Sequence, residues 1–381
     1  MKVYLVGGAV RDQLLGLPFS ERDWVVVGAT PEEMLAKGYT RADMDFPVFL
    51  HPESGEEYAL ARVEVKTAPG YKGFELSYGA EITLEQDLLR RDLTINALAM
   101  DDSGNVIDLC EGQRDLDEGL LRHITPAFSE DPLRLLRIAR FAAKLGEWGF
   151  RVAHATHGLM KNMATESELQ TLSAERVWRE MSRSMSESQP WRFFEVLHRC
   201  GALQGLLPEV AQEMDRDSAG HGSAEVSQLV SGLKRVVSIS DESAVRSSVA
   251  LFHSAQKQSD AKSWIGLRRI DKQTAQTLGD LLYFSSRLDL IEGTDNLFDL
   301  VMVLKPRQQP ERYQRFLLSA EALWPAIMEK LNARLDHAVQ VVLEPVPEEI
   351  SQSGLRGPAL GDAIRAWRLA YLQQKLNGLD N

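Results

Sequence analysis

The stretch YLVGGAVRDQLLG, from Tyr4 to Gly16, is followed after a short gap by ERDWVVVG, from Glu21 to Gly28. The first stretch is a short apolar run that stops at two glycines and continues with helical spacing, and the second is a valine-rich run. We therefore expect a strand, a glycine turn, a helix and a second strand. The remaining questions are what the glycine turn approaches and why two acids open the second strand.

The glycines at positions 7 and 8 remove the Cβ atoms at the start of the expected helix. A phosphate can approach such a backbone closely, and the N–H groups of a helix start attract it. Arg11 lies one turn into the helix and could reach the same phosphate. The alternative is a tight strand-to-helix turn without a ligand, and the glycines alone fit both.

Glu21 and Asp23 are two residues apart, so on a strand their side chains share a face. Two neighbouring carboxylates repel each other unless a cation lies between them. Magnesium binds carboxylate oxygens and substrate phosphates together. A phosphate-binding turn followed by an acid pair has the layout of a two-metal nucleotidyl transfer site. The alternative for the acid pair is a solvated strand edge.

The composition limits the classes of protein. With 381 residues, the chain is too long for one ordinary core and fits two or three packed units. The net charge of −12 means that a nucleic-acid surface would have to be local, or the charge serves solubility alone. No apolar stretch predicts a membrane helix or a signal segment, and the two cysteines do not suggest a zinc site. We expect a cytoplasmic protein.

The first 125 residues are rich in short strands, with helical stretches between them. In TPEEMLAKG, Thr30 is a candidate N-cap, Pro31 the first helical residue and Gly38 the residue past the end. Residues 84–100 read as helical. From Ser129 onward the helical period dominates, with Ser129 as the N-cap of the clearest helix and two acids in its first turn. A polar stretch at residues 215–227 predicts a boundary or hinge.

Several motifs now resemble, in order and spacing, those of the nucleotidyltransferases related to polymerase β, in particular the class II CCA-adding enzymes and bacterial poly(A) polymerases. The match runs from Met1 to Pro208. The glycine turn with RDW resembles the family's first motif, and further motifs are RRDLTINALA (90–99), EDPLRLLRIARF (130–141) and LSAERVWRE (172–180). Residues 66–74 fall where the family has a flexible loop.

The resemblance implies an α+β protein. A mixed α/β nucleotidyltransferase head, like the palm of polymerase β, would span residues 1–125, and a helical neck with the nucleotide-selecting helix would span 126–210. A helical body and tail, residues 211–381, would bind tRNA and contain a degenerate HD-like region. That region has His253 beside Ser254 where an HD phosphohydrolase needs a His-Asp pair, so we expect no phosphohydrolase activity.

The implied reaction is the template-independent addition of C, C and A to the 3′ end of tRNA from CTP and ATP, with release of pyrophosphate. The family's metal ligands correspond to Glu21 and Asp23, which are the expected catalytic residues and the ligands for Mg²⁺. The family has Asp at the first position, so the Glu predicts retained activity with an altered metal preference. No protein partner is implied.

The resemblance also assigns nucleotide contacts. Gly8 and Arg11 would hold the triphosphate, and Arg91 resembles another nucleotide contact, whose alternative role is an ion pair with Asp92. Asp131 and Arg134 are three apart, so on a helix they share a face, and together a carboxylate and a guanidinium can read the Watson–Crick edge of C or A. Two further arginines continue this stripe and resemble nucleotide contacts, although an arginine stripe also fits a solvated face: Arg137 and Arg140.

Other functions stay open. Residues 45–62 resemble the proteobacterial tRNA nucleotidyltransferases rather than the poly(A) polymerases, and the segment at 66–74 favours full CCA addition. A CC-adding, A-adding or poly(A) polymerase relative is an alternative, and so is a catalytically weakened RNA-binding protein, because of Glu21 and the altered HD region. In the C-terminal half, residues 266–270 and 305–315 are basic patches that could contact tRNA or be ordinary surface.

Overall fold

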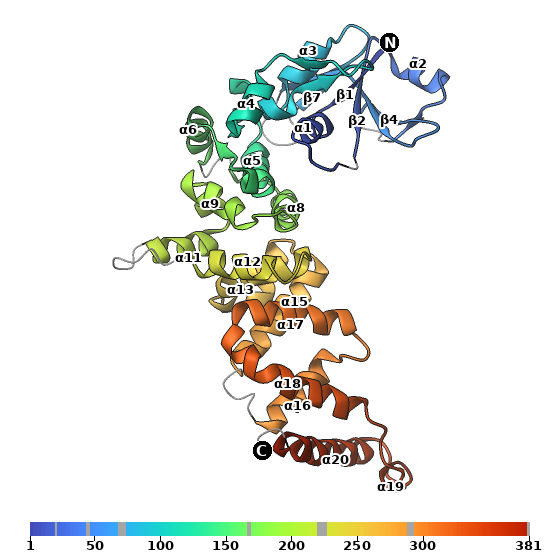
Figure 1. Cartoon of the computed structure of the whole chain (residues 1–381), viewed down its shortest axis with the longest axis vertical. Coiled ribbons are helices and arrows are strands. Elements are labelled where there is room, and N and C mark those ends of the chain that lie inside the picture. Colours follow the sequence, from blue (N-terminus) through green and yellow to red (C-terminus); the bar gives the residue numbers. More distant parts are fainter. Residues whose placement is uncertain are drawn as a thin grey trace. The chain divides into compact units, whose positions relative to one another are not determined.

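The computed structural model describes residues 1–19, 21–42, 46–67, 74–165, 169–218, 227–287 and 293–378. The chain forms two compact units, Met1–Pro208 and Glu209–Asn381. The first contains the sheet, and the second is built of helices (Figure 1). This α+β architecture was predicted from the sequence. No helix among these residues is both long and apolar enough to cross a membrane.

The main sheet has seven strands in the order β3, β4, β5, β2, β1, β8, β9. Neighbours are antiparallel except β2 and β5, which are parallel. The bounds in chain order are Lys2–Val6 (β1), Asp23–Val27 (β2), Thr40–Arg41 (β3), Val48–Leu50 (β4), Glu57–Leu60 (β5), Leu98–Met100 (β8) and Val106–Asp108 (β9). Two small sheets pair Arg62–Lys66 (β6) with Phe74–Tyr78 (β7), and Leu120–Leu121 (β10) with Arg151–Val152 (β11).

Alternation along β2 places its side chains in two cores. Val25 packs in one cluster with Val6, Leu88 and Ala99. Val26 packs in the other with residues that include Met34, Phe49 and Leu60. The sheet is thus buried against apolar groups on both faces, which fixes the register of β2 and hence the place where Asp23 begins it.

The short helices of the sheet region are Gly8–Leu14 (α1), Pro31–Ala36 (α2), Leu84–Leu89 (α3) and Gly112–Glu118 (α4). The predicted cap of α2 is confirmed, because the Thr30 side chain accepts a hydrogen bond from the Glu33 amide and the Glu33 carboxylate accepts one from the Thr30 amide. The prediction of continuous helix over 84–100 is wrong. After α3 the chain forms a 3₁₀ turn, Thr94–Asn96 (η2), and then β8, because Leu98–Met100 complete the sheet between β1 and β9.

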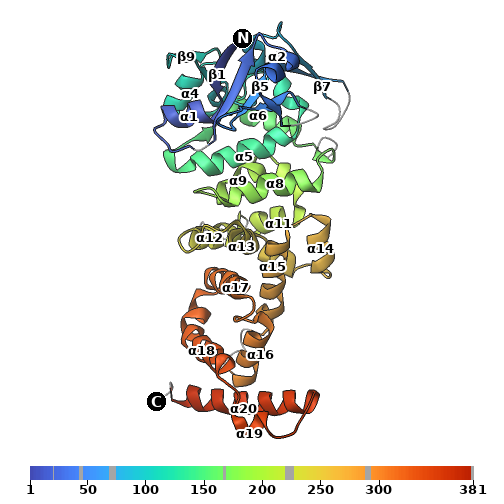
Figure 2. The same ribbon diagram turned by 90° about the vertical axis from the view of Figure 1, so that its right-hand side faces the viewer.

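The rest of the first unit is mainly helical. It comprises Pro126–Glu130 (η3), Leu133–Leu145 (α5), Gly146–Trp148 (η4), His154–Met163 (α6), Ala174–Met185 (α8), Trp191–Arg199 (α9) and Ala202–Leu206 (α10). Helix α5 packs against α8 and α9, as Figure 2 shows. Ser129 is not its N-cap, because the helix begins after Pro132 and the Ser129 hydroxyl donates to the Pro126 carbonyl.

In the second unit, every element of the described residues is a helix. These are Pro208–Ser218 (α11, which begins one residue before the division), Gln228–Val237 (α12), Ser243–Gln256 (α13), Ala261–Leu267 (α14), Lys272–Ser285 (α15), Thr294–Leu304 (α16), Pro310–Leu323 (α17), Pro325–Leu343 (α18), Glu348–Ser351 (α19) and Pro358–Asn377 (α20). Helix α13 packs against α12, α15 and α17, and α18 packs against α16 and α20.

Candidate active site

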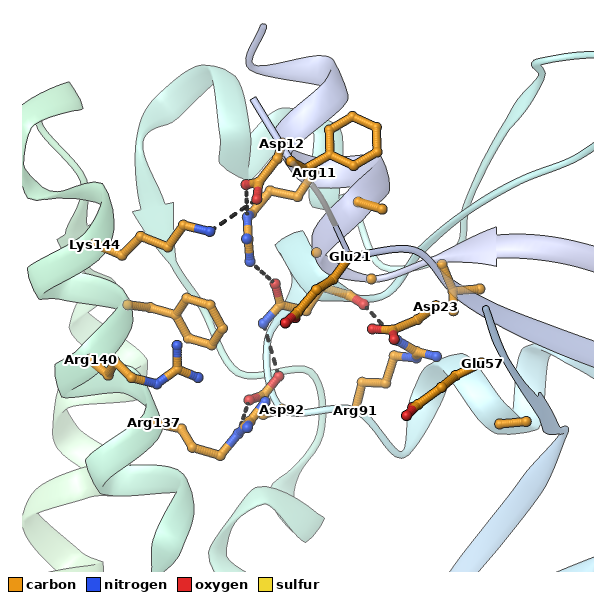
Figure 3. A pocket seen from close by; sticks show the side chains of 18 of the residues that line it. Arg11, Asp12, Glu21, Asp23, Glu57, Arg91, Asp92, Arg137, Arg140 and Lys144 are labelled. Atoms are coloured by element: carbon orange, nitrogen blue, oxygen red, sulfur yellow. Dashed lines mark hydrogen bonds and ion pairs between the residues drawn. The ribbon is translucent and has the colours of Figure 1, made fainter. Parts of the chain in front are cut away.

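A cleft of about 1030 Å³ lies in the first unit, between the ends of β1, β2 and β5 and the exposed side of α5. Figure 3 shows its acidic and basic side chains. All nine residues selected from the sequence line this cleft: Gly8, Arg11, Glu21, Asp23, Arg91, Asp131, Arg134, Arg137 and Arg140. Residues from positions 8 to 140 therefore meet at one place.

The glycine turn between β1 and α1 is sterically constrained at Gly7. This residue has φ of +70°, and a Cβ atom there would lie 2.8 Å from Nη1 of Arg91. A Cβ on Gly8 would meet its nearest neighbour, Nη2 of Arg11, at an ordinary 3.5 Å. The turn itself therefore requires glycine at position 7, whereas glycine at position 8 leaves the backbone open toward the cleft.

Three carboxylates stand at the sheet end of the cleft. Asp23 is the first residue of β2, and Glu21 precedes the strand, so the prediction that both lie on a strand is wrong. The third, Glu57, was missed from the sequence. It is the register partner of Asp23 on the parallel strand β5, so both side chains point to the same face and into the cleft (Figure 3).

The carboxylate of Asp23 is open to the cleft, but the surrounding protein partly desolvates it, which raises its pKa. The positive charge of Arg91 opposes this rise in the pKa, and the negative charge of Glu21 adds to it. Within the described part of the chain, the side chains of Glu21, Asp23 and Glu57 accept no hydrogen bond and form no ion pair. No three acidic, His or Cys side chains among these residues converge into a ready-made metal site. Oxygen atoms from a bound substrate would have to complete the coordination of an ion here.

The opposite end of the cleft is basic and comes from α5. Arg137 donates from Nε to Oδ2 of Asp92 at 2.6 Å. One turn further, Arg140 donates from Nε to Oε2 of Glu180 at 2.8 Å. Lys144 forms an ion pair of 3.0 Å with Asp12. Each cation is therefore held by a carboxylate from another element before any ligand binds.

A chain of hydrogen bonds joins α1 to α5 beneath the cleft (Figure 3). Arg11 donates to Asp12 at 2.8 Å and to the side-chain oxygen of Asn96 at 2.6 Å. Asn96 donates in turn to Asp92, the partner of Arg137. Burial alone would raise the pKa of Asp92, but Arg137, Asn96 and Arg134 outweigh it and lower that pKa to about 2. Asp92 is thus a permanent anion at the centre of the site.

Arg91 does not form the ion pair with Asp92 that was the alternative to nucleotide binding. Its Nη2 instead donates to Asp87 on α3 at 3.1 Å, and its Nη1 donates to the Asn96 carbonyl at 3.3 Å. The side chain passes next to Gly7 and lines the cleft. The Asp87 contact fixes the guanidinium between the glycine turn and Asp23.

Asp131 and Arg134 line the cleft, but not as two residues on one helix face. Asp131 is extended, precedes α5 and accepts a hydrogen bond from the Leu133 amide. Its other oxygen accepts one from Arg176 of α8 at 3.2 Å. Arg134 donates to the backbone carbonyl of Arg90 at 3.0 Å. The predicted helix geometry is therefore wrong for Asp131, although the two side chains do reach the same cleft.

The charge of the cleft differs from that of the whole chain. Nine basic and eight acidic side chains line it, whereas the chain carries a net charge of −12. Four of the basic groups come from α5, whereas the unpaired acids lie toward the sheet, beside Arg91 (Figure 3). A polyanionic ligand therefore meets local positive charge despite the acidic protein.

In the basic patches predicted in the second unit, three of the six basic side chains form ion pairs with neighbouring acids. Arg268 contacts Glu209 at 2.7 Å, Arg312 contacts Asp280 at 2.6 Å and Arg315 contacts Glu242 at 3.2 Å. This pairing favours their interpretation as ordinary surface. His253 lies on α13 with its ring edge-on to Phe252. Most of the predicted flexible loop at 66–74 lies outside the described residues.

Two family models match the chain, one within the first unit and one that extends a few residues beyond it. One, the poly A polymerase head domain, matches residues 3–122. The other, described as a probable RNA and SrmB-binding site of polymerase A, matches residues 149–214. The head model covers the strands and turns that carry the acids and glycines, and the second begins after α5.

Full-length relatives match as well. The CCA-adding enzyme of Pseudomonas putida is 42% identical over 99% of this chain and 100% of its own. The multifunctional CCA protein of Thioalkalivibrio sulfidiphilus is 40% identical over 98% of both chains. The fold resembles that of the Bacillus stearothermophilus CCA-adding enzyme in complex with CTP, with a TM-score of 0.69, 21% identity and coverage of 99% and 94%. The Thermotoga maritima CCA-adding enzyme complexed with tRNA gives a TM-score of 0.67 at 22% identity, with coverage of 97% and 87%.

Proposed function

The chain belongs to the CCA-adding enzymes, and on that premise we propose that it adds C, C and A to the 3′ end of tRNA. CTP and ATP are the nucleotide donors, pyrophosphate is released, and no nucleic acid serves as template. The observation that carries this proposal is the cleft itself, in which unpaired carboxylates face an arginine-rich helix across a glycine turn. Such a cleft can hold a metal ion and a triphosphate together.

Glu21 and Asp23 are the proposed metal ligands and catalytic residues, and Glu57 is placed to assist them. Oxygen ligands of this kind suit a hard divalent cation, and we propose Mg²⁺. The fit is supported by the raised pKa of Asp23, because surroundings that disfavour a lone carboxylate favour one that is paired with a cation. When bound, the ion would stabilise charge on the attacking oxygen and the leaving phosphates. Glu21 presents its carboxylate one methylene further out than an Asp would.

The triphosphate would lie between the glycine turn and α5. The backbone at Gly8 is open toward the cleft, and Arg11 and Arg91 flank it. Arg137 and Arg140 face it from α5. Guanidinium groups are suited to phosphate oxygens because their donors form a planar fork. These five residues would orient the α-phosphate toward the 3′-hydroxyl of the RNA.

Selection of the base is assigned to Asp131 and Arg134, which line the same cleft. A carboxylate accepts from the exocyclic amine that both C and A carry, and a guanidinium donates to a ring nitrogen or carbonyl oxygen. The contact between Asp131 and Arg176 and the contact between Arg134 and the Arg90 carbonyl hold the two side chains in place. A rigid pair of this kind discriminates by leaving wrong bases with unpaired polar groups.

The remaining parts of the proposal concern the whole chain. Residues 1–125 would act as the catalytic head, 126–210 as the neck and 211–381 as the tRNA-binding body and tail. We propose no phosphohydrolase activity, since Ser254 follows His253 and donates its hydroxyl to Glu213. The two free cysteines suit a reducing cytoplasm, the compartment proposed here.

The test uses the purified protein with tRNA that lacks its 3′ CCA, Mg²⁺ and single labelled nucleotides, read on a sequencing gel. The proposal expects C, C and A in succession and then a stop. Addition of C only or A only would assign a partial activity, and long A tails would assign a poly(A) polymerase. Retained tRNA binding without any incorporation would identify a catalytically weakened RNA-binding protein and contradict the proposal.

A further inference from the structure

The ring of Phe141 lies among three arginines of the cleft. Phe141 belongs to α5, is 5% exposed and lines the cleft. The guanidinium carbon of Arg140 is 4.7 Å from the centre of its ring, that of Arg11 is 5.1 Å away and that of Arg137 is 5.8 Å away. One phenyl ring therefore contacts three cations that come from two helices, α1 and α5.

Three guanidinium groups around one point repel one another, and no ligand is needed to create this arrangement. The face of an aromatic ring carries negative potential and attracts a guanidinium within about 6 Å of its centre. The ring therefore offsets part of the mutual repulsion of Arg11, Arg137 and Arg140. An aliphatic side chain of similar size fills the same space but has no such potential.

The hydrogen bonds of these arginines leave donors free for a ligand. Arg137 and Arg140 each donate to a carboxylate through Nε. Their terminal nitrogens donate no hydrogen bond within the described part of the chain, and Nη1 of Arg140 forms a long ion pair of 3.9 Å with Glu187. A carboxylate thus contacts the Nε edge of each of these two guanidinium groups, and the Phe141 ring lies beside both groups. Their terminal nitrogens remain available to a ligand.

We propose that Phe141 is a positioning residue that holds Arg11, Arg137 and Arg140 in the arrangement that binds the triphosphate. This inference rests on the proposed function, because it assumes that these arginines bind the phosphates. Phe141 itself touches no reacting atom. It acts before binding, so that the nucleotide does not have to bring the three cations together against their repulsion.

The experiment compares Phe141→Leu with Phe141→Tyr. Affinities for CTP and for inorganic pyrophosphate are measured by calorimetry on the full-length protein without tRNA. In Phe141→Leu, the affinities for CTP and for pyrophosphate should both fall about tenfold, because three cation–π contacts are lost together. Phe141→Tyr keeps the ring and should bind both ligands within about twofold of the wild type. With tRNA, KM for CTP should rise in the Leu variant while kcat changes little, the pattern of a lost ground-state contact.

Phe194→Leu is the matched control. Phe194 is fully buried on α9, which packs against α5, and its ring is edge-on to Phe193. The same substitution there should lower stability without changing the affinity for pyrophosphate. If Phe141→Leu does not fold, Phe141→Met replaces it, since its flexible side chain fills the space without a ring.

Two results overturn the inference alone: ring-less variants that bind pyrophosphate as the wild type does, or a Tyr variant that loses as much affinity as the Leu variant. A wild-type protein that binds neither CTP nor pyrophosphate would overturn the proposed function as well. The two failures are therefore distinguishable in one series of titrations.

Discussion

The carboxylates of Glu21, Asp23 and Glu57 at the sheet end of the cleft have no hydrogen-bond or ion-pair partner among the described residues, whereas three of the cations on α5, Arg137, Arg140 and Lys144, are each paired with a carboxylate. At the helix end, a carboxylate from another element contacts every one of Arg137, Arg140 and Lys144. The unpaired acids form the side that an incoming cation can satisfy. The paired cations are already oriented and can receive phosphate through their remaining donors.

This difference has a consequence for stability and function. Removing an unpaired acid should lower activity but hardly lower stability, because that acid interacts with the bound cation and not with another side chain. Removing an acid that pairs with a cation should cost stability as well, because it leaves a guanidinium without its carboxylate. The following substitutions test the two ends of the cleft in turn.

The largest effect is expected for Asp23→Asn. The neutral amide no longer binds the ion that would stabilise the reacting phosphates, so incorporation should fall on the order of a thousandfold or more. Nucleotide incorporation and tRNA binding are measured in parallel, and binding should stay nearly unchanged. Asp117→Asn, an exposed acid on α4, is the control. Turnover that survives Asp23→Asn would refute the ligand role.

Glu57→Gln should have a smaller effect on the same end of the cleft. We expect activity to fall by about 10- to 100-fold and the Mg²⁺ concentration for half-maximal activity to rise, because one oxygen ligand becomes a neutral amide. The neighbouring Glu56 accepts a hydrogen bond from the Trp24 indole and serves as the control. Glu56→Gln should leave the metal titration unchanged. Identical metal titrations for Glu57→Gln and the wild type would remove Glu57 from the site.

Asp92→Asn tests the paired end through stability. The folded-state pKa of about 2 lies below the ordinary value of 3.8, so the charge contributes stability above about pH 4 that is lost as the pH falls toward 2. The variant should lose about 2 kcal/mol of unfolding free energy at pH 7. Urea unfolding between pH 7 and pH 2 measures this difference, which should shrink below pH 4. A deficit that stays constant over the whole pH range would contradict the ionic origin.

The smallest effect concerns Arg134. Arg134→Ala should raise misincorporation of U and G relative to C and A by about tenfold, because a donor to the base edge is lost. Arg134→Lys keeps the charge but not the planar fork, so it should lose selectivity too. Competition between labelled nucleotides measures the ratio. Selectivity equal to that of the wild type in both variants would remove the template role of Arg134.

The sequence predicted those parts of the secondary structure that depend on interactions between adjacent residues. The cap at Thr30 and the valine-rich strand follow from adjacent residues, and the structure has both, although the strand begins at Asp23 rather than at Glu21. The start of α5 was misplaced because Ser129 enters a 3₁₀ turn, and Asp131 is held by Arg176 of another helix. Leu98–Met100 became a strand because two partner strands flank it, which no local pattern reveals.

The site shows the same limit. The sequence motifs identified nine residues that line the cleft, but Glu57 was not among them. In the sequence, Glu57 is only an acid at the start of an alternating run. It reaches the cleft because β5 lies parallel to β2 and pairs Glu57 with Asp23. Likewise, the pairing of Asp92 with Arg137 joins residues 45 positions apart. Sequence motifs identified the residue types, whereas the sheet order and the docking of α5 decided which of them meet.

The most direct test of the central claim is a crystal structure of the protein with CTP and Mn²⁺, with the ion located by its anomalous scattering. We predict an ion within coordination distance, about 2.2 Å, of oxygen atoms from both Glu21 and Asp23 and of the nucleotide phosphates. Arg137 and Arg140 should contact the same triphosphate. An ion bound elsewhere, with both carboxylates facing solvent beside a bound CTP, would contradict the account.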